Sequence, residues 1–166
     1  MFDFSILRNY VVIMFLIVIF LLFFGNINFL IFMPPSATGK GISKFNRAWL
    51  ISINGIGDLV GRLSVGVVGD LNIIPRYKIL SVTSGLCGIS ILCYSFTSTF
   101  WVMCVCVSLY GFFTGCYIAN NTPTLIDLVG IELMAKVLAL TMFISGLGVT
   151  IGQTVLGRLH VDRCFD

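Results

Sequence analysis

The residues best suited to chemistry in this sequence are an acid and a base inside a long apolar run. Asp58 and Arg62 lie four residues apart, so on a helix both side chains project from one face, with the acid in the more favourable N-terminal position. At a bilayer centre one charge costs about 2.5–3.5 kcal/mol on insertion scales, so charged side chains there pair or face protein or trapped water. Such a pair indicates a substrate or proton site; the alternative is an ion pair that only joins helices.

Other polar residues accompany this pair. Asn54 lies one helical turn before Asp58 and extends the same polar face. Residues 120–123 read Asn-Asn-Thr-Pro inside another apolar run, and their proline lacks the backbone N–H that a helix needs. Polar side chains beside such a bend either line a cavity or bond the carbonyl groups that the bend frees. Asn54, Asn120 and Thr122 are therefore candidates for lining a site.

One phrase suggests a different chemistry. Residues 55–58 read Gly-Ile-Gly-Asp, which matches the GxGD phrase of intramembrane aspartyl proteases. Aspartyl chemistry needs two carboxylates that share a proton. Asp70 and Asp127 both lie at the ends of apolar runs, so Asp58 has no second aspartate at mid-run. The sequence leaves a protease as a disfavoured alternative.

Glycines recur at a spacing that suits close helix packing. Small residues four positions apart let two helix backbones approach each other within a membrane. The pairs with this spacing are Gly57/Gly61, Gly111/Gly115 and Gly148/Gly152. They predict tightly packed helix pairs and no particular chemistry.

The composition identifies the kind of element that must position these residues. The chain has 166 residues, of which 58% are apolar and 10% charged, with a mean hydropathy of +1.05. Soluble domains have roughly 45–50% apolar and about 25% charged residues. Because the apolar residues form runs of about 20, enough for a helix to cross a bilayer, rather than alternating as in an outer-membrane barrel, the sequence predicts an all-α membrane protein.

Five such runs are separated by short connectors. We expect transmembrane helices at about 10–33, 47–69, 79–96, 100–125 and 136–159. The first is expected to end at the Pro34-Pro35 pair. No linker is long enough to separate domains, so we expect one membrane domain in contact with the lipid bilayer. The odd number of spans suggests a piece of a larger assembly.

Charge and cysteine content exclude several further functions. The net charge is only +3, and no basic patch is interleaved with aromatic residues, so we expect no nucleic-acid partner. Five of the six cysteines lie inside apolar runs, and no cysteine or histidine spacing suits zinc. We expect these cysteines to be small core residues and expect no metal or other cofactor.

Several phrases, in order along the chain, resemble one family. They are residues 3–5 (Asp-Phe-Ser), 32–37 (Phe-Met-Pro-Pro-Ser-Ala), 55–66 with the Asp-x-x-x-Arg pair, 66–76 with Asp70 and Arg76, 110–115, 125–130, and 152–159. Together they resemble spans seven to eleven of a twelve-span monocarboxylate transporter of the major facilitator superfamily. The fold expected from this resemblance is a partial C-terminal bundle of that superfamily.

The resemblance also implies a function, which is proton-coupled movement of a small carboxylate by alternating access. It implies that Arg62 receives the substrate carboxylate and that Asp58 takes part in proton coupling. Asp70 and Arg76 resemble a degenerate copy of the superfamily's loop motif and are expected to form a gating loop.

The implied partners are a small carboxylate, a proton, and the missing half of the carrier or a partner subunit. We expect a plasma-membrane transporter and no enzyme. The alternatives are a carrier for another solute and a truncated, non-transporting membrane protein that pairs with other carriers.

Overall fold

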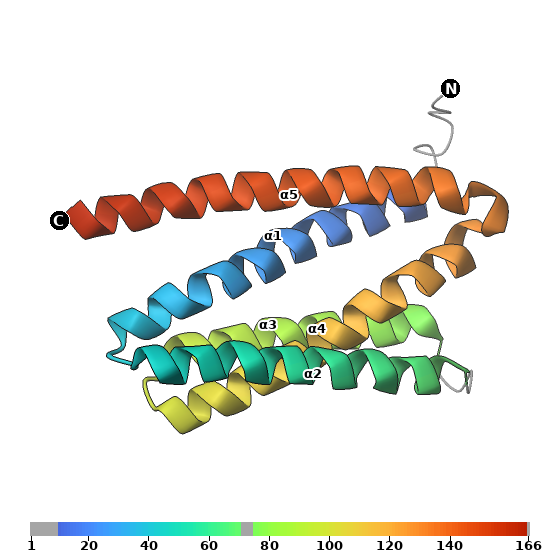
Figure 1. Ribbon diagram of the computed structural model, residues 1–166. Helices are drawn as coiled ribbons and strands as arrows, with labels where there is room; N and C mark the ends of the chain where they lie inside the picture. Colours follow the sequence, from blue (N-terminus) through green and yellow to red (C-terminus); the bar gives the residue numbers. More distant parts are fainter. Residues whose placement is uncertain (1–9, 71–74, 166) are drawn as a thin grey trace. The chain divides into compact units, whose positions relative to one another are not determined.

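All regular structure in the described part of the chain is helical (Figure 1). The computed structural model describes residues 10–70 and 75–165, with the side chains of residues 11, 70, 132, 156 and 158–165 outside the description. The helices are α1 (Tyr10–Gly39), α2 (Lys44–Asp70), α3 (Arg76–Phe96), α4 (Phe100–Val129) and α5 (Ile131–Phe165). Each is long and apolar enough to cross a membrane. The predicted all-α fold with five transmembrane helices is confirmed.

Helix α1 continues beyond the point where the sequence predicted its end. It runs through Pro34 and Pro35 to Gly39, although two prolines remove two backbone donors. Side chains add hydrogen bonds at this point. The Thr38 hydroxyl donates to the Pro34 carbonyl at 3.0 Å, and the Tyr94 hydroxyl of α3 donates to the Met33 carbonyl at 3.1 Å.

A glycine ends α1 instead of the prolines. Gly41 has a φ of 76°, a left-handed conformation that favours glycine. The N–H groups of Gly41 and Ile42 bond the carbonyls of Thr38 and Ala37 at 3.0 Å each, the arrangement of a Schellman cap. Gly130, with a φ of 77°, ends α4 in a similar way, and its N–H bonds the Ile126 carbonyl at 2.9 Å.

The chain forms two compact units whose limits fall inside α1 and α4. One unit comprises Met1–Phe32 and Leu125–Asp166, and the other comprises Met33–Thr124. Both limits lie within two residues of a proline, at Pro34 and Pro123. The expected organisation as one membrane domain stays a prediction.

In the first unit, α1 packs against a stripe of small residues on α5. A methyl group built on Gly148 would lie 3.1 Å from the Phe20 carbonyl oxygen, and one on Gly152 would overlap with the Asn28 amide. The Asn28 side chain is buried and donates to the Phe24 carbonyl of its own helix. The predicted role of the Gly148/Gly152 pair in close packing is confirmed.

In the second unit, α2 and α4 contact each other backbone to backbone. A methyl group on Gly57 would lie 2.6 Å from the Ser108 carbonyl oxygen, and one on Gly61 would overlap with the Phe112 carbonyl oxygen. The other two GxxxG predictions are therefore confirmed as well, because these glycines face the α4 stripe that contains Gly111 and Gly115. This contact fixes the part of α2 that carries the polar residues.

Candidate functional site

The polar pair predicted on α2 forms an ion pair. Arg62 Nε lies 2.9 Å from Asp58 Oδ2, and the side chains of Arg62 and Asp58 are 48% and 26% exposed. Within the described part of the chain, the terminal Nη1 and Nη2 atoms of Arg62 make no hydrogen bond or ion pair. Because Asp58 is bonded to Nε, the planar fork of the guanidinium keeps donors for a second carboxylate.

Helix α4 holds the backbone that carries this pair. A methyl group on Gly115 would overlap with the Asp58 carbonyl oxygen, and one on Gly111 would overlap with the Asn54 carbonyl oxygen. The thiol of Cys116, the residue after Gly115, donates to the Gly61 carbonyl of α2 at 3.3 Å. Position and rotation of the polar face of α2 are therefore set by a close helix contact.

Asn54 lies next to this contact and offers a further polar atom. Its side chain is half-buried, and its Oδ1 would lie 3.0 Å from a methyl group on Gly111. Oδ1 is buried and accepts no hydrogen bond from the described residues. A buried acceptor without a donor is costly, so this oxygen is suited to a ligand or water that brings a donor.

Asn120 has a partner elsewhere. Its side chain is 1% exposed, and its Nδ2 donates to the Arg76 carbonyl at the start of α3 at 2.7 Å. The Asn120 carbonyl accepts the Thr124 hydroxyl at 2.7 Å. Thr122, the fourth candidate binding residue, is half-buried on the same helix. The amide of Asn120 on α4 thus bonds the start of α3, whereas the Asp58 backbone of the ion pair on α2 packs against Gly115 of α4.

The expected gating loop lies partly outside the described residues. Asp70 is the last residue of α2, but its side chain and residues 71–74 are not described. Arg76 is the first residue of α3 and is half-buried. Its main-chain bond to Asn120 ties the end of this loop to α4. A contact between Asp70 and Arg76 stays a prediction.

Sequence reasoning missed a polar cluster at the other end of α3. Lys40 Nζ donates to the Thr97 carbonyl at 2.6 Å and to the Tyr94 carbonyl at 3.0 Å, and it lies 4.8 Å from the centre of the Tyr94 ring. A cation that bonds the last carbonyls of a helix stabilises its C-terminus. The signal was weak, because Lys40 lies 54 residues from Tyr94 in sequence.

A thiol–hydroxyl contact between α3 and α4 was likewise not predicted from the sequence. Cys87 Sγ lies 3.2 Å from Thr114 Oγ1, and both helices are uncharged at this level. Cys87, Cys106 and Cys116 are buried, as expected for small core residues, whereas Cys93 is exposed on α3.

Comparison with known proteins decides the family. The family model described as Major Facilitator Superfamily matches residues 6–162, nearly the whole chain. The chain belongs to the major facilitator superfamily. The expected fold family is thereby confirmed, and the five described helices form part of a superfamily bundle.

Similar curated proteins are monocarboxylate transporters. The chain is 30% identical to "Monocarboxylate transporter 1" of Bos taurus over 84% of this chain and 28% of that protein. It is 27% identical to "Monocarboxylate transporter 7" of Homo sapiens over 80% of this chain and 26% of that protein. With "Monocarboxylate transporter 2" of Mesocricetus auratus it shares 28% identity over 99% of this chain and 34% of that protein. The chain thus spans about a third or less of these relatives, and the resemblance to this transporter type is confirmed.

Proposed function

We propose that this chain is part of a secondary transporter that moves a small monocarboxylate together with a proton by alternating access. The observation that carries the proposal is the Asp58–Arg62 pair, in which the guanidinium is held through Nε and keeps its terminal nitrogens for another anion. The names of the similar proteins support a monocarboxylate as that anion.

In this proposal Arg62 binds the substrate carboxylate through both Nη atoms. A planar guanidinium bonds a carboxylate in a bidentate manner, which a lysine ammonium cannot do. The carboxylate then competes with Asp58 for the same cation. Protonation of Asp58 removes this competition, so binding of the proton favours binding of the substrate.

Asn54 is proposed to bind a polar group of the same substrate. Its buried Oδ1 lies one helical turn from Asp58 and accepts no hydrogen bond from the described residues. Asn120 and Thr122 are kept as proposed lining residues, although the amide of Asn120 would first have to leave the Arg76 carbonyl. Asp70 and Arg76 are proposed to belong to a loop that helps to close the path.

Alternating access explains why α2 and α4 contact each other so closely. Carriers of this kind bind substrate near the bilayer midplane and rock one bundle against another around the site. The glycine contact fixes Asp58 and Arg62 to α4, so that both side chains move with one rigid pair of helices.

From the resemblance we extend the proposal to location in the plasma membrane. Fluorescence microscopy of a tagged chain tests this location.

The deciding experiment substitutes Arg62 in a complete carrier that contains this segment. Uptake of a labelled monocarboxylate is measured with and without an inward proton gradient. Arg62→Lys is expected to abolish most uptake at normal membrane abundance, since lysine keeps the charge but loses the fork. Arg47→Lys is the matched control, because Arg47 lies on the same helix and bonds the Thr38 hydroxyl instead. Undiminished proton-driven uptake by Arg62→Lys would contradict the proposed role of Arg62 in binding the substrate.

A further inference from the structure

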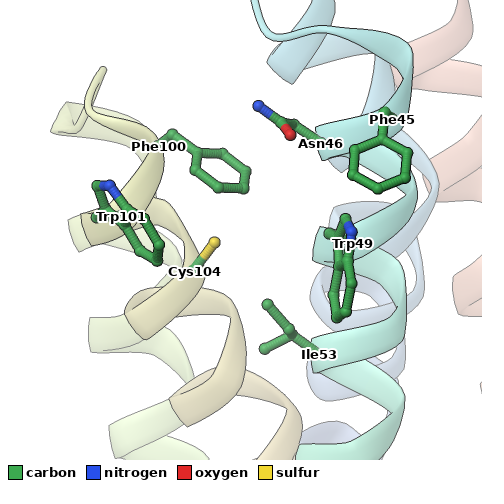
Figure 2. Close-up of a pocket in the computed structure, with 7 residues that line it drawn as sticks. All are labelled: Phe45, Asn46, Trp49, Ile53, Phe100, Trp101 and Cys104. Carbon is green, nitrogen blue, oxygen red and sulfur yellow. The ribbon is translucent and has the colours of Figure 1, made fainter.

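The first turns of α2 and α4 form a groove that the proposed transport site does not use. Its volume is about 630 Å³, and it is lined by Phe45, Asn46, Trp49 and Ile53 of α2 and by Phe100, Trp101 and Cys104 of α4. Figure 2 shows the rings from the two helices on opposite sides of the groove, with the Asn46 amide pointing into it. Farther along, the two helices come into close backbone contact, where Gly57 meets Ser108.

The groove lies at the ends of two membrane-spanning helices, where lipid surrounds it. Both helices are membrane-spanning by length and composition, and the lining residues belong to their first turns. These turns lie where a span meets the headgroups, the level at which tryptophan rings gather in membrane proteins. Trp49 and Trp101 are 50% and 77% exposed, so the groove is open to molecules from the bilayer.

The charged residues around the mouth of the groove are all basic, which favours an anionic ligand. Lys40, Lys44 and Arg47 are the only charged residues between positions 33 and 57, and none is acidic. Lys40 bonds the end of α3 and Arg47 bonds Thr38, whereas Lys44 is exposed at the start of α2, next to Phe45 of the groove. Neither α2 nor α4 has an acidic residue in its first turn, so the positive ends of both helix dipoles add to this charge.

We propose that this groove binds an anionic phospholipid, with one acyl chain between the aromatic rings and the headgroup at Lys44. The Asn46 amide points into the groove and can donate to an ester oxygen of the lipid. The apolar lining suits the chain, and the unopposed positive charge suits the phosphate. This site is separate from the ion pair on α2 and does not depend on the proposed transport.

The chain carries its own reporter for this site, because its two tryptophans both line the groove. The full chain is placed in phosphatidylcholine vesicles that contain increasing fractions of phosphatidylglycerol with brominated acyl chains, which quench tryptophan fluorescence. Quenching is expected to saturate at a low fraction of the brominated anionic lipid. Brominated phosphatidylcholine is expected to need a several-fold higher fraction for the same quenching.

Two pairs of variants separate the groove from general lipid contact. Lys44→Gln is expected to remove most of the preference for the anionic lipid, whereas Lys78→Gln, an exposed lysine at the start of α3, is expected to keep it. Cys104→Phe fills the groove and is expected to weaken quenching by both lipids. Cys93→Phe adds the same ring at an exposed position on α3 and is expected to leave quenching unchanged.

Each remaining outcome overturns the proposal. Quenching that rises in proportion to the brominated fraction, equally for both lipids, would indicate random contact with bulk lipid. Saturable quenching without a charge preference would indicate an apolar site for any acyl chain. Tryptophans protected from every brominated lipid, together with a dimer cross-linked through Cys104, would assign the groove to a second copy of this chain.

Discussion

Arg62 and Asp58 share one bond, and that single bond determines what each side chain can still do. Asp58 occupies only the Nε donor of Arg62, so an incoming carboxylate finds the Nη fork available. A carboxylate and a protonated Asp58 can therefore be bound together, whereas two ionised carboxylates would repel each other at one cation. The direction of coupling follows, since uptake should increase as the outside becomes more acidic.

Replacing the acid separates transport from coupling. Asp58→Asn in a complete carrier keeps the size of the side chain but can no longer exchange a proton. We expect uptake driven by the substrate gradient to persist and its increase at acidic external pH to disappear. Counterflow of labelled substrate and uptake across a series of external pH values measure the two effects. A normal pH response in Asp58→Asn would place the coupling proton on another group.

The sequence predicted this pair but not the partner of Asn120. An i,i+4 ion pair is a local feature, and helix geometry alone brings Asp58 to Arg62. Asn120 bonds the carbonyl of Arg76, which is 44 residues away, and a main-chain acceptor leaves no trace in the sequence. The burial of Asn54 Oδ1 could not be predicted from the sequence either, because it depends on packing against α4.

At the scale of elements, the contact between α2 and α4 depends on the absence of side chains. Gly115→Ala would place a methyl group on the Asp58 carbonyl oxygen, and the neighbouring atoms are backbone that cannot move aside. Overpacking of this kind costs about 1–3 kcal/mol or more. We therefore expect Gly115→Ala to lower the thermal stability of the purified chain and to shift the polar face of α2.

Gly55→Ala is the matched control on the opposed helix. Its added methyl group would meet nothing within 4 Å, and alanine is favoured over glycine in helices by up to about 1 kcal/mol. We expect unchanged or increased stability in the same melting experiment. Equal losses for Gly55→Ala and Gly115→Ala would show that the two helices do not pack at this contact.

The end of α3 depends on Lys40, which lies in the connector between α1 and α2. Lys40→Met removes the donor to the Tyr94 and Thr97 carbonyls, and Tyr94→Phe removes the donor to the Met33 carbonyl. Each lost hydrogen bond is worth about 0.5–1.5 kcal/mol, and more where the donor is charged. Lys40→Met should therefore destabilise the chain more than Tyr94→Phe. Lys78→Met should have little effect, and detergent melting curves that order the three variants differently would contradict this account.

Helix limits were predictable where a glycine ends a helix and misleading where prolines lie inside one. Pro34 and Pro35 predicted the end of α1, yet the helix continues to a Schellman cap at Gly41. The hydroxyl of Tyr94 reaches this segment from α3, so tertiary contacts outweigh the local preference of the prolines. Five spans were nevertheless predictable, because runs of about 20 apolar residues have few alternatives to a transmembrane helix.

For the whole molecule, the exposure of the ion pair is the informative quantity. Arg62 is 48% exposed in this chain, and an uncompensated charge in lipid costs several kcal/mol. In carriers of this kind the substrate path lies between two bundles, so the polar face of one bundle is covered by the other. The similar transporters are between three and four times as long as the matched region, which leaves room for such a second bundle.

We therefore expect the 166-residue chain alone to bind membranes but not to transport. A path needs a second wall opposite Arg62, and without it substrate bound at the Nη fork is not enclosed. Proteoliposomes with the purified chain should show no saturable uptake of labelled lactate or pyruvate under an inward proton gradient. Supplying the first six spans of a monocarboxylate transporter in the same vesicles is the matched test, and the Arg62→Lys chain with the same spans is its control. Saturable, pH-driven uptake by the chain alone would mean that five helices, singly or as a dimer, enclose a complete path, and it would contradict the need for a second bundle.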